Sequence, residues 1–147
     1  MLVRFRALLA AAWAGFLLCI AFVAAPTAFA VLERAQAGSV VQRLFELDAR
    51  LGLAAGLLLV MMERRLQRDG VSTGRAGSAL GWNTVLPLVA LATIVAGYYA
   101  LQPMMEAAKA GQGALSFGAL HGISMAFFAL KGLAVLVLAW RVSRPAV

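Results

Sequence analysis

The sequence predicts an all-α fold: a four-helix transmembrane bundle with up-down topology and both termini in the cytoplasm. Three observations predict this class: the apolar composition, four long apolar segments, and the placement of arginine and lysine between them. Hydrophobic residues make up 63% of the 147 and charged residues 13%, whereas soluble domains are roughly half apolar and about a quarter charged. A chain of this length favours a single transmembrane domain, residues 1–147.

The first apolar segment covers about residues 7–32 and contains no charged residue. At about 1.5 Å per residue it is long enough to cross the ~30 Å hydrocarbon layer. A cleaved signal peptide is the alternative, because Arg4 and Arg6 would form its basic start and residues 27–30 read Thr-Ala-Phe-Ala. The apolar run exceeds the usual length of a signal peptide's core, so we favour a membrane span.

The second segment, about residues 37–62, differs from the others because its uncharged part, Leu51 to Met62, is too short to cross a bilayer alone. A span here must extend upstream, which draws charged side chains into its outer half. These side chains are Arg43, Glu46, Asp48 and Arg50. They are the most informative feature of the chain, since charges inside a span normally face the bundle or water and mark function.

The third and fourth segments cover about residues 79–101 and 114–140. We expect the polar, glycine-containing connection 63–78 to form a flexible cytoplasmic loop. The connection 102–113 would then lie on the outer side and end at its Gly-Gln-Gly sequence.

The predicted orientation follows from the positive-inside rule. Three basic residues fall near the outer side: Arg34, Arg43 and Lys109. The larger group on the opposite side consists of Arg4, Arg6, Arg64, Arg65, Arg68, Arg75, Arg141 and Arg144. Both termini are therefore expected in the cytoplasm, and the net charge of +7 needs no nucleic-acid partner to explain it. We expect a multi-pass protein of the bacterial inner membrane.

The charged side chains of the second segment divide between two faces of its helix. Glu46 lies three residues after Arg43 and four before Arg50, so these three share a face, while Asp48 points roughly the opposite way. We favour functional roles for Glu46 and Arg50. For Arg43 and Asp48 we favour a role in fixing the depth of the helix at the outer interface.

On the fourth segment His121, Ser124 and Lys131 share one broad face, which we expect to point inward. Two interpretations of Lys131 stay open: a buried pair with an acid of the second helix, or a side chain that extends toward the cytoplasmic headgroups. For His121 we favour a hydrogen-bonded interfacial residue. Small residues spaced by four permit close approach of helices. They occur at Gly52 and Gly56 and again at Gly118 and Gly122.

Several kinds of chemistry are excluded or disfavoured. One cysteine, Cys19, and one histidine leave no intramolecular disulfide, Cys-x-x-Cys motif or pair of axial histidines for haem. Methionines near His121 suggest Cu(I) only weakly, because methionine in an apolar helix is usually packing material. No catalytic constellation or phosphate loop is recognisable. We therefore expect a non-enzyme without a metal site or cofactor.

Residues along nearly the whole chain resemble the bacterial transmembrane protein 205-like family. The resemblance rests on Trp13, Gly15, Phe16, Ala25-Pro26, Phe29, Ala37-Gly38, Leu44-Phe45, Gln102-Pro103, Met105 and the F-x-x-x-H-x-x-S pattern of Phe117, His121 and Ser124. Where that pattern places an asparagine seven positions after the histidine, this chain has Phe128. The resemblance implies a four-helix membrane protein without an assigned reaction, related to a eukaryotic protein associated with resistance to platinum drugs.

Three functions compete. The first is a non-enzymatic membrane protein whose polar residues Glu46, Arg50, His121, Ser124 and Lys131 organise the bundle and line a small cavity for an ion or solute. The second is an accessory subunit that packs against a larger membrane protein, or a homo-oligomer, through the glycine faces. The third, disfavoured, is a metal- or haem-handling redox protein.

Overall fold

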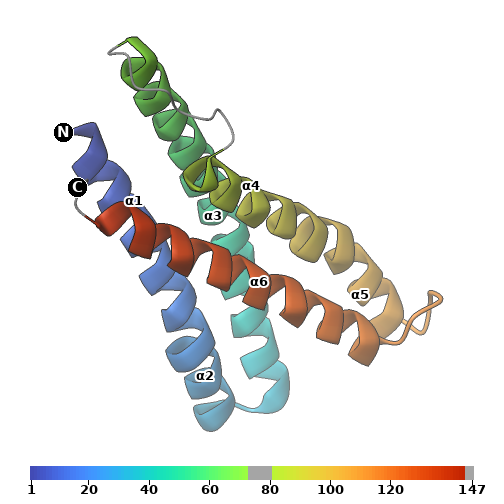
Figure 1. Cartoon of the computed structure of the whole chain (residues 1–147). Helices are drawn as coiled ribbons and strands as arrows, with labels where there is room; N and C mark the ends of the chain where they lie inside the picture. The colour runs from blue at the N-terminus through green and yellow to red at the C-terminus, as the bar shows by residue number, and fades with distance from the viewer. Residues whose placement is uncertain (73–80, 145–147) are drawn as a thin grey trace.

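The computed structural model describes residues 1–72 and 81–144, and almost all of these residues are helical. Figure 1 shows long helices joined by short connections. In chain order the elements are α1 (Leu2–Cys19), η1 (Ile20–Ala24) and α2 (Ala25–Val31), then α3 (Arg34–Ser72), then α4 (Trp82–Ile94), η2 (Val95–Ala100) and α5 (Leu101–Lys109), and last α6 (Phe117–Ser143). Because the first three elements are continuous, as are α4, η2 and α5, the described residues form four long helices. The predicted all-α class is confirmed for the described residues.

Two π-helical turns, η1 and η2, each come shortly before a proline, Pro26 and Pro103 respectively. Proline has no N–H to donate, and its ring clashes with the carbonyl four residues earlier. Those carbonyls belong to Phe22 and Tyr99, and both lie inside the π turns. The wider turn relieves the clash without ending the helix.

The four long helices pack in a ring. α1 contacts α3 and α6, and α4 contacts the same two helices. In Figure 1 α6 crosses in front of the bundle while α3 lies behind it. Helices α3 and α6 are therefore diagonal neighbours across the bundle.

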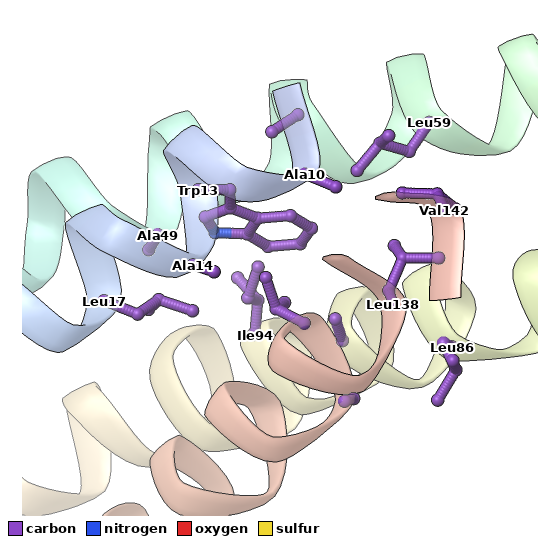
Figure 2. Packing of buried hydrophobic residues seen from close by; sticks show 14 residues of the cluster. Ala10, Trp13, Ala14, Leu17, Ala49, Leu59, Leu86, Ile94, Leu138 and Val142 are labelled. Atoms are coloured by element: carbon purple, nitrogen blue, oxygen red, sulfur yellow. The ribbon is translucent and has the colours of Figure 1, made fainter. Parts of the chain in front are cut away.

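The core of the bundle consists mainly of small and aliphatic side chains around one large aromatic residue, Trp13 (Figure 2). Its indole ring lies against the glycine face of α3. A Cβ placed on Gly52 would come within 3.3 Å of the ring, and one placed on Gly56 within 3.4 Å. The glycine pair of α3 therefore allows α1 to approach closely, as the sequence predicted. On α6, by contrast, a Cβ at Gly118 or Gly122 would meet nothing within 4 Å, so that pair makes no helix contact within the described chain.

The outer surface of the bundle is apolar. Large side chains such as Phe22 and Trp140 are 75% and 67% exposed, and soluble monomers rarely expose contiguous apolar surface of this extent. Three of the four long helices, residues 2–31, 82–109 and 117–143, are long and apolar enough to cross a membrane. These features define a membrane protein.

Helix α3 does not meet the same criterion of apolar length, because its uncharged stretch is short and charged residues flank it. It is also longer than predicted. The predicted loop at 63–78 is wrong for residues 63–72, which continue α3, while residues 73–78 lie outside the described part of the chain. Arginine, leucine and glutamine are good helix formers, and they make up much of this extension.

The predicted outer connection at 102–113 is likewise wrong over its first part, because the third long helix continues to Lys109. The helix ends where Gly111 adopts a φ of +74°. The amide of Gly111 then donates to Ala108 O at 3.1 Å and that of Gln112 to Ala107 O at 2.8 Å. This is a Schellman motif, which favours glycine at the left-handed position.

Candidate functional site

A buried ion pair joins the two diagonal helices. Asp48 on α3 accepts a hydrogen bond from Lys131 Nζ on α6. The two residues are only 1% and 5% exposed. Lysine has a long aliphatic stem and aspartate a short one, so Lys131 supplies most of the reach across the bundle. A charge pair in this position is a functional-site candidate, because ionisable side chains are expensive inside a membrane protein.

Two phenylalanine rings lie next to the ion pair. Lys131 Nζ lies 4.8 Å from the centroid of the Phe128 ring, within the range of a cation–π contact. Phe45 of α3 packs edge-to-face on the same ring, with 5.2 Å between centroids. The position where the resembled family pattern has an asparagine thus carries an aromatic ring that contacts the ammonium group.

Two polar atoms near the pair are buried and, among the described residues, have no hydrogen-bond partner: Asp48 Oδ1 and Trp13 Nε1. The indole nitrogen would lie 3.5 Å from a Cβ on Gly52, one helical turn after Asp48 on the same helix. In Figure 2 this nitrogen is on the side of the ring toward Ala49. An acceptor and a donor without partners therefore lie at neighbouring turns of α3, at Asp48 and beside Gly52.

The structure resolves the two interpretations of Lys131 in favour of a buried pair, and its partner is Asp48. Glu46 instead binds the guanidinium groups of Arg43 and Arg50, the latter at 2.5 Å, on the exposed side of α3. The expectation that Glu46 and Arg50 point inward is therefore wrong. The predicted opposition of the two faces holds, but the face with Asp48 is the one that turns to the core, because it also carries the small residues Ala49 and Gly52.

The other two residues predicted for the inward face of α6 lie apart from the ion pair. His121 is exposed and stacks on Phe117, with 5.8 Å between ring centroids, so an inward position for His121 is wrong. Ser124 donates to Gly97 O at 3.2 Å. That carbonyl is accessible because the Leu101 amide, its usual partner in an α-helix, donates to Tyr98 O at the end of η2.

A second set of polar contacts joins the last part of α3 to the starts of α1 and α4. Arg6 forms an ion pair with Glu63 at 2.5 Å, and both side chains are largely buried. Gln67 donates to Thr84 Oγ1 at 2.9 Å, which ties α3 to α4. The sequence analysis did not predict this pair, because the partner of Arg6 is 57 residues away, beyond the reach of helical spacing.

No metal centre is evident in residues 1–72 and 81–144, since no three His, Cys, Asp or Glu side chains in them gather closely enough to bind an ion. Cys19 is exposed.

Taken together, the fold and the site define a helical membrane protein with an ion pair buried between diagonal helices. The chain belongs to the family described as a domain of unknown function, DUF4149, which it matches over residues 8–114. The match includes Asp48 and Trp13 but ends before Lys131. No curated protein and no solved structure matches the chain.

Proposed function

We propose that this chain is a non-enzymatic, multi-pass protein of the bacterial inner membrane that binds a small ion or polar solute beside the Asp48–Lys131 pair. Its four helices alternate in direction, α3 crosses the membrane, and both termini face the cytoplasm. Within its family it stands with the transmembrane protein 205-like members. The observation that carries the proposal is the charge pair, whose two residues are almost fully buried between α3 and α6.

The chemistry of the neighbouring atoms narrows the class of ligand. An ionised carboxylate only accepts hydrogen bonds, and an indole N–H only donates. A ligand that serves both Asp48 Oδ1 and Trp13 Nε1 must therefore donate and accept. A water molecule, through which a proton can be relayed, or a small hydroxyl-bearing solute meets this requirement, whereas a bare metal ion cannot accept from the indole.

The arrangement also supports a binding role over a purely structural one. A buried ion pair contributes little net stability compared with well-packed apolar residues of similar volume. Apolar side chains at positions 48 and 131 would hold the bundle equally well. The pair leaves one carboxylate oxygen free beside a free N–H, which is the arrangement a polar ligand needs.

The test combines two measurements on the full chain purified in mild detergent. Native mass spectrometry reports a retained small molecule, and liposomes that contain a pH-sensitive dye report proton flux under an imposed potential. We expect wild-type protein to give at least one of these signals. The double variant Asp48→Asn/Lys131→Met and the variant Trp13→Phe should lose it.

Glu46→Gln provides the control, because Glu46 lies on the same helix but turns away from the pair. It should keep the wild-type signal. The proposal fails if wild-type protein shows neither a retained molecule nor flux above protein-free liposomes, or if the double variant keeps the full signal.

A second function, an accessory subunit or homo-oligomer, is favoured by the open face of α6. Gly118 and Gly122 are exposed and contact no other helix of the described chain, whereas the equivalent pair on α3 is packed. The same native spectrum tests this function. A complex with a second protein, lost in Gly118→Leu/Gly122→Leu, would favour it over the ligand-binding proposal.

A further inference from the structure

An open groove of about 750 Å³ lies between the start of α1 and the last turns of α3. Arg4, Phe5 and Leu8 line it from α1, and Arg65 and Asp69 line it from α3. It lies at the end of the bundle away from the α2–α3 connection (Figure 1). It is distinct from the buried ion pair and shares no residue with it.

The two arginines of the groove are free to bind a ligand. Their neighbours in sequence, Arg6 and Glu63, neutralise one another at 2.5 Å and hold α1 against α3. Arg4 and Arg65 are exposed, and within the described residues neither forms an ion pair. One carboxylate, Asp69, lines the same groove, so the guanidinium groups outnumber it.

The same groove is strongly apolar on its α1 side. Phe5 is 57% exposed and Leu8 68% exposed, one helical turn from each other and next to Arg4. Guanidinium groups bind phosphate through paired hydrogen bonds, while exposed aromatic and aliphatic side chains favour hydrocarbon. The groove therefore combines recognition of an anionic phosphate with a surface for an acyl chain.

The position of the groove selects the ligand. Residues 2–31 form a helix long and apolar enough to cross a membrane, so its first turns lie at the depth of the headgroups. We propose that this groove binds the headgroup of an acidic glycerophospholipid, with the phosphate on Arg4 and Arg65 and the first acyl carbons on Phe5 and Leu8. A soluble phosphate ester would leave the apolar side chains without a partner.

The experiment is a native mass spectrometry titration of the detergent-purified full chain with phosphatidylglycerol, phosphatidylcholine or glycerol 3-phosphate. Wild-type protein should bind phosphatidylglycerol more tightly than the other two. The variant Arg4→Gln/Arg65→Gln should bind it about ten- to thirtyfold more weakly, since each arginine near an anionic lipid surface contributes a several-fold gain.

Arg64→Gln is the matched control, because Arg64 is the exposed neighbour of Arg65 on the same helix but does not line the groove. It should bind as wild type does. Arg4→Lys/Arg65→Lys keeps both charges and so controls for a general effect on folding. Its affinity for phosphatidylglycerol should lie between that of the wild type and that of the glutamine variant.

Three results would overturn the proposal. The first is equal loss of phosphatidylglycerol binding in the Arg64→Gln control and the double glutamine variant. The second is equal affinity of wild-type protein for phosphatidylcholine. The third is binding of glycerol 3-phosphate as tight as that of the lipid, which would assign the groove to a soluble anion.

Discussion

At the residue scale, the stability of the bundle depends on the match between Asp48 and Lys131. Removing one member of a buried pair leaves the other as an uncompensated charge, which costs about 3–5 kcal/mol. We therefore expect Asp48→Asn and Lys131→Met each to lower the free energy of unfolding by about that amount. The double variant should recover most of the loss. Thermal unfolding in detergent, followed by tryptophan fluorescence, measures all three.

The free energy of unfolding of the double variant tests whether the two side chains compensate one another. If it is no more stable than the single variants, the two side chains do not compensate one another and the pair is not the contact described here. Glu46→Gln, whose carboxylate pairs with arginines on the exposed face of α3, should change stability by no more than about 1 kcal/mol, as is usual for surface ion pairs.

A second prediction at the residue scale concerns the glycines. A Cβ on Gly52 would lie 2.8 Å from Ile94 Cδ1 and 3.3 Å from the Trp13 ring, so Gly52→Val should force α1 and α4 away from α3. The expected cost is about 1–3 kcal/mol, typical of overpacking in a tight core. Gly122→Val places the same side chain where the described chain leaves open space, and it should be nearly neutral. Equal effects of the two substitutions on unfolding would contradict the packing.

At the scale of elements, the sequence predicted the four helices well because each rests on a local signal: an apolar run, its length, and the glycines or charges that bound it. Their ends were harder to predict. Residues 63–72 and 102–109 were predicted to belong to connections, yet both stretches lie within helices. Good helix formers continue α3 through residues 63–72, and the π turn η2 accommodates Pro103. The bond from Gln67 to Thr84 is a long-range contact that no local spacing reveals.

The candidate site was also predicted only in part from the sequence. The spacing of Arg43, Glu46 and Arg50 correctly placed these residues on one face, opposite Asp48, and the depth of Lys131 suggested an acidic partner on the second helix. The prediction of the inward face was wrong, because the small residues beside Asp48 decide which face packs in the core, and the charges do not. Trp13 entered the sequence argument only through the family resemblance, since one tryptophan in an apolar span gives no signal that its N–H is buried.

The extension of α3 over residues 63–72 leads to the prediction at this scale. Glu63 is held by Arg6 of α1, and both side chains are largely buried. Glu63→Gln should therefore weaken the attachment of α1 to α3 by about 1.5–3 kcal/mol, the range for hydrogen bonds to charged groups. Limited trypsin digestion should then cut faster after Arg64, Arg65 and Arg68. Glu106→Gln, which alters an exposed pair with Lys109, serves as the control and should leave the digestion rate unchanged.

At the scale of the whole molecule, the question is whether α3 crosses the membrane like its three neighbours. It lacks their apolar length, but its residues Gly52 and Gly56 pack at the centre of the bundle against Trp13 and α4. A helix in that position packs between α1 and α4, and its charged side chains at residues 43–50 are paired with one another or with Lys131. Contacts with neighbouring helices thus take the place of the lipid contacts that a longer apolar stretch of α3 would make.

This argument predicts the side on which each connection lies. In a Cys19→Ala background, we expect a membrane-impermeant maleimide to label Gln36→Cys and Gln112→Cys from outside intact spheroplasts. Ser72→Cys and Ser143→Cys should react only after permeabilisation. All four positions are exposed in the structure, so a difference in reactivity reports sidedness and not burial. If α3 lay on the surface, Ser72→Cys would react from the same side as Gln36→Cys. Only two crossings instead of three would then precede α6, so Gln112→Cys would react only after permeabilisation.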